Sequence, residues 1–361
     1  MINNKQNELQ ELEAQKCWEY LLKHKQGIAH FSQRFGKIKF TIELIRKLKL
    51  DNPNILICYP DNKIKGSFLD DFEKWNFKEN VTFVNFSSLR KFDKTYYEIV
   101  ICDEPQNLSI GEIESLSKIK YDYRILLSGT LNKETQSRLK QSLDIDIMSE
   151  YLIENAIKDN IVADYNITVH KVELNNTIKD RESKGKKITE KQLYDNYTFV
   201  IEKLKRESKD FMFLALHRNR ISQSSLAKKN KTLQLLKQLE DKRCLVFTGL
   251  AKMAESLSIP YYHTKCKNTS DFDAFKEGNI SKLALVGVGK VGVSYFGLDS
   301  IIINNFVGNS EELAQVISRS LLLDFKEKVG DIHILVLNEK AELTKLDKAL
   351  GLLDKTKIRY A

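Results

Sequence analysis

The stretch "GIAHFSQRFGKIKFTIELIRKLKL", residues 27–50, joins an apolar run, a short polar loop and an amphipathic run. Gly27–Phe31 has the pattern of a buried strand, and Phe40–Leu48 repeats its apolar residues at the spacing of a helix. Gly36 and Lys37 lie in the loop between them. A strand that passes through a short loop into a helix is the repeating unit of α/β proteins, so this stretch predicts that fold class.

The same alternation continues along the chain. Further apolar, β-branched runs are separated by helical patterns, and such continuous runs are typical of parallel strands buried on both faces. We therefore expect two doubly wound parallel sheets, in units 1–164 and 165–361, with a polar, solvated loop at 175–191 between strand-rich regions. The predicted strands are Gly27–Phe31, Ile55–Tyr59, Val81–Phe86, Glu98–Cys102, Arg124–Ser128, Arg243–Gly249, Leu283–Val288, Ser300–Phe306 and Asp331–Asn338.

Composition restricts the class of protein. The chain is 42% hydrophobic and 30% charged, as in globular domains, and carries a net charge of +9, which suits a polyanionic partner. No apolar run approaches the roughly 20 residues of a membrane span, and the polar N-terminus lacks a signal sequence. We expect a cytoplasmic protein, or one in a host cytoplasm if the lysine-rich, AT-biased composition reflects a phage origin. The five widely spaced cysteines do not form a zinc motif.

The loop at Gly36 and Lys37 has the context of a phosphate-binding loop. Gly36 would let the backbone approach a phosphate, and Lys37 would reach its oxygens from the start of a helix. The residue that usually follows is Ser or Thr, whose hydroxyl binds Mg²⁺, whereas here Ile38 follows. Thr41 lies one helical turn further on, so the pattern leaves open whether it substitutes.

Two further strand ends carry polar residues. "YEIVICDEPQNL" (97–108) ends its apolar run in Asp103 and Glu104, and "RILLSGTLNKE" (124–134) ends in Ser128, Gly129 and Thr130. Adjacent carboxylates at the end of a buried strand are costly and therefore favour a chemical task, such as holding Mg²⁺ and positioning a water. An ordinary acidic turn before Pro105 is the simpler alternative for this segment alone.

The order of these segments resembles the superfamily-two helicases and translocases, including DEAD/DEAH-like, Swi/Snf-related and phage-type members. Gly36-Lys37 resembles motif I, Asp103-Glu104-Pro105-Gln106 motif II, and Ser128-Gly129-Thr130 motif III. "ILICYPDNKIKG" and "VTFVNFSSLRKF" resemble motifs Ia and Ib, and Gln15 lies where such enzymes often have an adenine-reading glutamine. The resemblance implies two RecA-like lobes with a nucleotide cleft between them.

The second half resembles the other lobe of this family. "RCLVFTGLAKM" resembles motif IV, "LALVGVGKVGVS" motif V, and "ELAQVISRSLLLDF" motif VI. Gln315 and Arg319 match motif VI, but Leu322 replaces its final arginine, which usually stabilises charge on the γ-phosphate. Motifs I and VI are therefore degenerate.

The resemblance implies roles for named residues, with ATP and Mg²⁺ as cofactors and nucleic acid, DNA rather than RNA, as the partner. Asp103 would hold Mg²⁺ carried by ATP. The catalytic set would be Lys37, Asp103, Glu104, Gln315 and Arg319. The nucleotide-binding set would be Gln15, Arg34, Gly36, Lys37 and Gly292. The residues that contact nucleic acid or couple it to the nucleotide would be Pro60, Lys63, Ser87, Ser88, Ser128, Thr130, Thr248 and Gly249.

Two hypotheses follow. The first is an ATP-dependent nucleic-acid helicase or translocase, because Lys37, Asp103, Glu104 and Arg319 remain. The second is a hydrolysis-deficient, helicase-like protein that binds nucleic acid or serves as a scaffold, because Ile38 and Leu322 depart from the pattern at chemically demanding positions. We favour the enzyme, since a relic would have little reason to keep the costly pair of carboxylates.

Overall fold

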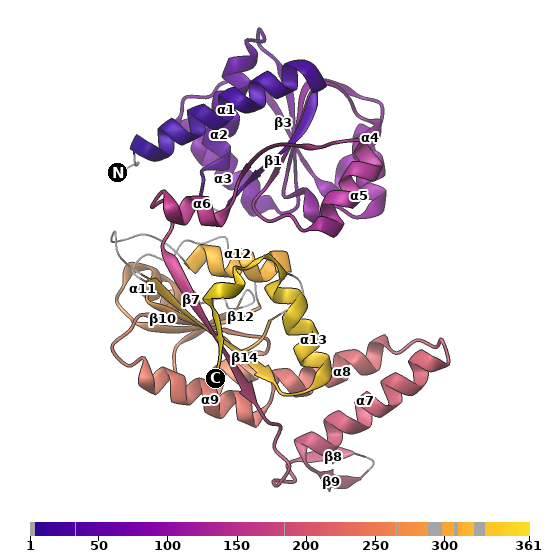
Figure 1. Ribbon diagram of the computed structural model, residues 1–361, viewed down its shortest axis with the longest axis vertical. Helices are drawn as coiled ribbons and strands as arrows, with labels where there is room; N and C mark the ends of the chain where they lie inside the picture. Colours follow the sequence, from indigo (N-terminus) through magenta and orange to yellow (C-terminus); the bar gives the residue numbers. More distant parts are fainter. Residues whose placement is uncertain are drawn as a thin grey trace. The chain divides into compact units, whose positions relative to one another are not determined.

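The computed structural model describes residues 4–32, 34–183, 185–263, 266, 268–287, 298–306, 310–320 and 329–361, without the side chains of Lys63, Gln315 and residues 318–320. The chain forms two compact units, Met1–Val162 and Ala163–Ala361. Figure 1 shows the first unit in indigo to magenta and the second in magenta to yellow. Each unit is built around its own sheet and is described separately.

In the first unit the described strands form a six-stranded sheet in the order β3-β2-β4-β5-β1-β6, and all of its pairings are parallel. Its central strands are almost wholly buried, which explains their continuous apolar sequence. The strands are β1 (Gln26–Phe31), β2 (Asn54–Tyr59), β3 (Asn80–Asn85), β4 (Tyr96–Asp103), β5 (Lys120–Ser128) and β6 (Ile147–Tyr151).

Helices cover both faces of this sheet, as Figure 1 shows, with α1, α2 and α3 on one face and α4 and α5 on the other. Phe40 and Phe68 lie in the core of the first face, and Leu116 and Leu139 in that of the second. The helices are α1 (Asn4–His24), α2 (Lys37–Leu48), α3 (Asn62–Lys74), α4 (Ile110–Lys118), α5 (Lys133–Leu143) and α6 (Ile153–Lys158), with 3₁₀ turns at η1 (Phe86–Phe92) and η2 (Pro105–Asn107).

Side-chain caps begin the two helices that follow the predicted site strands. At α4, Ser109 and Glu112 form a capping box, with the Ser109 N–H donating to Glu112 Oε2 at 2.8 Å. At α5, Asn132 Oδ1 accepts from the Thr135 N–H at 2.8 Å. These caps fix the first residues of α4 and α5. They therefore fix the lengths of the loops that follow β4 and β5 and carry the candidate residues.

The second unit contains a seven-stranded sheet among its described residues, in the order β11-β12-β10-β13-β14-β7-β15, again with parallel pairings. The strands are β7 (Asp164–Val172), β10 (Cys244–Thr248), β11 (Tyr261–His263), β12 (Lys282–Val286), β13 (Ser300–Ile303), β14 (Val329–Leu337) and β15 (Ile358–Tyr360). The helices of this unit are α7 (Glu190–Arg206), α8 (Met212–Gln223), α9 (Leu226–Gln238), α10 (Ala251–Glu255), α11 (Ser270–Glu277), α12 (Ser310–Ser320) and α13 (Lys340–Ala349), with 3₁₀ turns at η3 (Leu350–Leu352) and η4 (Lys355–Lys357).

A helical hairpin is inserted between β7 and β10. Helices α7 and α8 pack on each other and extend away from the sheet (Figure 1), and Tyr194 and Ile221 anchor their base next to Leu337. The segment 175–191, which we expected to be a solvated loop, contains the two-stranded hairpin of β8 (Arg181–Ser183) and β9 (Lys186–Ile188). Its polar residues are partly paired, because Arg181 forms an ion pair with the buried Glu190.

All nine strands predicted from apolar runs are present, and both sheets are parallel, so the predicted fold class is confirmed. The sequence patterns missed six further strands, β6, β7, β8, β9, β11 and β15. Among the helices that the structure describes, none is long and apolar enough to cross a membrane.

Candidate functional site

The strand order of the first sheet brings three of the predicted segments together. β4, β5 and β1 are neighbours and all run in the same direction, so Asp103, Ser128 and Phe31 end at one edge of the sheet. The carboxyl edge of a parallel sheet is where α/β folds bind ligands. The candidate site is therefore built from the loops that follow β1, β4 and β5.

The loop after β1 is held in a left-handed backbone conformation by glutamines from α1. Gly36 has a φ of +84°, and the preceding Arg34 a φ of +73°. The Gln6 amide donates to the Arg34 carbonyl at 2.7 Å, and the Gln10 amide donates to the Phe35 carbonyl at 2.5 Å. A Cβ at position 36 would lie 2.3 Å from Gln10 Nε2 and would displace this amide, and the positive φ itself favours glycine.

Lys37 is the first residue of α2 and lies against both carboxylates at the end of β4. Its Nζ is 2.6 Å from Glu104 Oε1 and 3.9 Å from Asp103 Oδ1, and all three side chains are at most 14% exposed. Burial raises the pKa of Asp103, the charge of Glu104 adds to this rise, and the Lys37 ammonium opposes it. A second cation beside Asp103 would lower this raised pKa and keep the carboxylate ionised.

Gln106 connects this cluster to the end of β5. Its side-chain amide donates to Glu104 Oε2, while its Oε1 accepts from Ser128 Oγ at 2.9 Å. Ser128 Oγ also lies 2.8 Å from the Thr130 carbonyl. A continuous chain of contacts therefore runs from Lys37 through Glu104 and Gln106 to Ser128.

The backbone of Glu104 is itself in an unusual conformation. Its φ is +54°, which lies in the left-handed region that non-glycine residues seldom adopt. Such backbone costs of order 1 kcal/mol and is concentrated at functional positions. Here it lets the Glu104 side chain face Lys37 immediately after the strand ends.

The donor set fits a magnesium-bound nucleotide. Gly36 and the start of α2 provide a backbone anion site, and Lys37 adds a cation. Asp103 Oδ1 is buried and accepts no hydrogen bond from the part of the chain that the structure describes, so it has capacity to bind a cation. Thr41 does not supply the missing hydroxyl, because its Oγ1 donates to the Lys37 carbonyl at 2.8 Å and the residue is fully buried. Ile38 packs against the core.

The structure does not bring Gln15 to the loop. Gln15 is on α1, where its amide donates to Glu19 at 2.8 Å and its oxygen accepts from Lys47 at 3.1 Å. Gln6 and Gln10 contact the loop instead, and our sequence analysis missed both. Their spacing of four residues, which puts them on one face of α1, was the available signal. Gln106 belongs to the segment that resembles motif II, but it is not among the predicted site residues.

Several predicted nucleic-acid residues of the first unit lie at the ends of β2 and β3. The Asn85 amide donates to the Pro60 carbonyl at 3.1 Å, and Asn85 Oδ1 accepts from both the Ser87 N–H and the Ser87 hydroxyl. Ser88 follows in η1, and Lys63 is in the first turn of α3, its side chain outside the described part. Asn85 thus joins the two predicted loops and was not anticipated.

The predicted residues of the second unit are only partly described. Thr248 is fully buried at the end of β10, and a Cβ at the adjacent Gly249 would lie 2.8 Å or less from the side chains of Gln223 and Asn305. Gln315 and Arg319 are on α12, but their side chains lie outside the described residues, as do Gly292 and Leu322.

Comparison with known proteins rests on structure. No protein-family model matches the sequence, and no curated protein is significantly similar to it. The DNA-bound, ATP-dependent Type ISP restriction-modification enzyme LlaBIII matches 99% of this chain over 30% of its own length, at 10% identity and a TM-score of 0.63.

Two smaller structures match over most of their length. The helicase domain of Hef from Pyrococcus furiosus matches 94% of this chain and 97% of its own, at 12% identity and a TM-score of 0.54. Dbp5 from S. cerevisiae, bound to RNA and ADP BeF3, matches 93% of this chain and 85% of its own, at 12% identity and a TM-score of 0.56. The structural likeness establishes the fold, and the low sequence identities leave the activity open. The chain therefore shares the fold of these structures, with two RecA-like α/β lobes.

Proposed function

We propose that the chain is a nucleic-acid-dependent ATPase that acts as a helicase or translocase, with DNA as its substrate. The observation that carries this proposal is the position of Lys37, within 4 Å of both Asp103 and Glu104 at the carboxyl edge of a parallel sheet. Lys37 would contact the β- and γ-phosphates of ATP, and Asp103 would hold the Mg²⁺ that neutralises phosphate charge. Glu104 would orient or deprotonate the attacking water.

The contacts of Lys37 imply an exchange of partners. Lys37 is paired with Glu104 at 2.6 Å, so contact with a phosphate would weaken this pair. Glu104 would then be able to accept a proton from water. Because Gln106 joins Glu104 to Ser128, a movement of the carboxylate would reach the loop after β5. This contact chain provides a physical route by which ATP hydrolysis could change the affinity for a nucleic-acid strand.

Support for a nucleic-acid partner comes from charge and from the predicted contact loops. The net charge of +9 suits a polyanion, and Asn85 holds together the loops that contain Pro60 and Ser87. Two of the structural matches are bound to DNA or RNA. Phosphate contacts would dominate affinity, so binding should weaken steeply with salt and depend little on base sequence.

A hydrolysis-deficient binding protein is the second candidate, favoured by one observation. The position after Lys37 is Ile38, and the next hydroxyl along the chain, that of Thr41, donates back into the helix and is fully buried. The binding of Mg²⁺ would therefore depend on the Asp103 carboxylate, without the hydroxyl ligand that usually follows the lysine. Such a protein would bind nucleic acid without turnover.

Steady-state ATP hydrolysis, measured with single-stranded, double-stranded and forked DNA and with the matching RNAs, separates these candidates. A motor should show hydrolysis that rises with one class of nucleic acid, and stimulation by DNA above RNA would support the assigned substrate. Nucleic-acid binding with hydrolysis at background in every mixture would establish the binding protein instead. Greatest stimulation by RNA would retain the motor and overturn the DNA assignment.

A further inference from the structure

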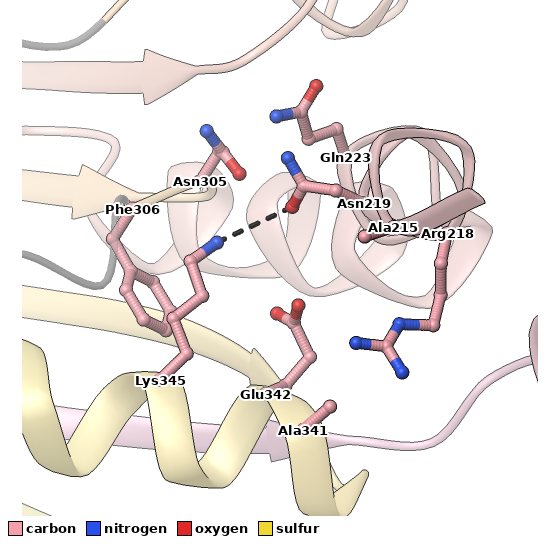
Figure 2. A pocket seen from close by; sticks show the side chains of 9 residues that line it. All are labelled: Ala215, Arg218, Asn219, Gln223, Asn305, Phe306, Ala341, Glu342 and Lys345. Carbon is pink, nitrogen blue, oxygen red and sulfur yellow. Dashed lines mark hydrogen bonds between the residues drawn. The ribbon is translucent and has the colours of Figure 1, made fainter. Parts of the chain in front are cut away.

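A second candidate site lies wholly within the second unit. A cavity of about 260 Å³ opens between α8, α13 and the segment that follows β13 (Figure 2). Its polar lining consists of Arg218, Asn219, Gln223, Asn305, Glu342 and Lys345. Phe306 forms an apolar wall beside Lys345. At roughly 30 Å³ per water molecule, the volume is large enough for a small ligand.

The lining carries excess positive charge. The carboxylate of Glu342 forms an ion pair with the buried Lys228, whose Nζ is 3.7 Å from Glu342 Oε2. Glu342 Oε2 also accepts a hydrogen bond from Ser222 Oγ at 2.9 Å. Although burial acts to raise it, the Lys228 and Lys345 ammonium groups hold the pKa of Glu342 below its usual value. Because the positive charge of Lys228 offsets the negative charge of Glu342, the lining keeps the charge of two cations, Arg218 and Lys345.

Amide groups converge on the same space. Asn305 is 6% exposed, and its side-chain amide forms no hydrogen bond within the described part of the chain. The side chain of Gln223 is likewise without one among these residues, and both amides lie beside Gly249. Lys345 donates to Asn219 Oδ1 over a long 3.4 Å, which leaves the Asn219 amide nitrogen as a donor (Figure 2).

The remaining groups are mainly donors. Arg218 contacts Thr198 with one nitrogen at 3.4 Å and retains other N–H groups. Burial lowers the pKa of Lys345, although Glu342 and Glu312 oppose this, so its ammonium is incompletely compensated. A ligand that supplies several acceptor oxygens and negative charge would satisfy Lys345, Arg218 and the unpartnered amides together.

We propose that this cavity binds a phosphate group, held by Lys345, Arg218 and the amides of Asn219, Gln223 and Asn305. The site lies within one unit and shares no residue with the cluster of Lys37, Asp103 and Glu104, so it does not depend on the proposed ATPase. The phosphate could belong to a small phosphorylated molecule or to a nucleic-acid backbone, which present the same oxygens.

Calorimetric titration with inorganic phosphate tests the proposal. The parent protein is Lys37→Ala, because phosphate binding at the loop of the first unit would otherwise add to the signal. We expect saturable binding by the parent and at least tenfold weaker binding after the additional change Lys345→Met, which keeps the aliphatic stem against Phe306. Lys340→Met, on the exposed face of the same helix, is the matched control and should bind as the parent does. Absence of saturable binding by the parent, or equal weakening by the control, would overturn the proposal.

A second variant guards against misfolding of the first. Asn305→Asp keeps the shape of the side chain but adds a negative charge to the lining of the cavity, so it should also weaken phosphate binding at least tenfold. Thermal unfolding of every variant verifies the fold. Normal phosphate affinity in a folded Asn305→Asp protein would contradict the assigned contacts.

Competition with a short oligothymidylate identifies the source of the phosphate. Two results together assign the cavity to a nucleic-acid backbone. The oligonucleotide displaces inorganic phosphate, and the slope of its log affinity against log salt concentration becomes shallower by about 1 in Lys345→Met. Unchanged phosphate binding in the presence of bound oligonucleotide assigns it to a small phosphorylated ligand. Both results support a phosphate site.

Discussion

Lys37 Nζ lies 2.6 Å from Glu104 Oε1, so the cation proposed to bind ATP is paired with the carboxylate proposed to activate water. The two residues are 67 positions apart, and they meet because β1 and β4 both border β5 in one parallel sheet. A bound phosphate would therefore compete with the Glu104 carboxylate for the Lys37 ammonium group, and this competition determines how variants on either side should behave.

Glu104→Gln should separate binding from hydrolysis. The change removes the negative charge that holds Lys37, so we expect ATP to bind several-fold more tightly. It also removes the proton acceptor, so the hydrolysis rate should fall by about 100-fold or more. Titration with ATP and a steady-state assay test the two effects. Glu114→Gln, on the exposed surface of α4, should change neither, and tighter binding by this control would contradict the explanation.

Gln106→Ala should disconnect the end of β4 from the end of β5. The amide contacts both Glu104 and Ser128, so its loss removes one of the contacts that orient the Glu104 carboxylate and keeps the carboxylate itself. We expect kcat to fall about tenfold while affinity for ADP is retained, in line with the modest cost of lost positioning. The exposed neighbour Asn107, whose side-chain amide donates to the Glu104 carbonyl and not to its carboxylate, supplies the control Asn107→Ala. An unchanged kcat in Gln106→Ala would show that the contact has no catalytic role.

Gly36→Ala should destabilise the first unit through the loop backbone. A φ of +84° costs a residue with a Cβ about 1–2 kcal/mol, and the new methyl group would also displace Gln10. Gly66→Ala is the matched control: it lies inside α3 with open space around its Cβ, so it should stabilise by up to about 1 kcal/mol. Urea unfolding measures both. Equal effects of the two substitutions would contradict the assigned backbone strain.

His170 and His333 should make the second unit sensitive to acid. Nε2 of His170 is 3.0 Å from Nδ1 of His333 on the adjoining strand, and burial lowers the pKa of His170 to about 4 and also lowers that of His333. A histidine whose pKa is lower in the folded state contributes stability above its unfolded pKa of about 6.5, and this contribution is lost as pH falls towards 4.

The expected loss is up to about 1.4 kcal/mol per pH unit for His170 in that range, and His333 contributes in the same direction. Because carboxylates also titrate there, the readout is the difference in unfolding free energy between wild type and His333→Gln at pH 7.5 and pH 4.5. The variant should lose less stability than wild type on acidification. His24→Gln, at an exposed position on α1, should follow the wild type. Parallel losses in all three proteins would exclude a contribution from the pair.

The central sheets were predictable because their strands are continuous apolar runs. "EIVIC" and "RILLS" could hardly be exposed, and they form the buried parts of β4 and β5. β6, with the sequence "IMSEY", mixes polar and apolar residues at the border of its sheet, and β11 has only three residues. Such strands owe their structure to pairing with neighbours, which a local pattern does not contain.

The candidate site was predictable where its residues follow strand ends. Asp103 and Ser128 end buried strands, Glu104 and Lys37 come after such strands, and the parallel sheet order gathers these residues. The supporting contacts were less accessible to sequence analysis. Several glutamines lie on α1, and whether Gln10 or Gln15 reaches the loop depends on how the helix packs. The link through Gln106 likewise requires the turn of η2, which begins at the left-handed Glu104.

The most direct test of the account is the steady-state rate of Mg²⁺-dependent ATP hydrolysis by wild type, Lys37→Ala and Lys47→Ala, each with saturating single-stranded DNA. Lys47 lies in the last turn of α2, away from the loop, and is the matched control for loss of a lysine from this helix. We predict DNA-stimulated hydrolysis by wild type and Lys47→Ala, and a rate about 100-fold lower in Lys37→Ala. Equal rates in wild type and Lys37→Ala would contradict the proposed ATPase.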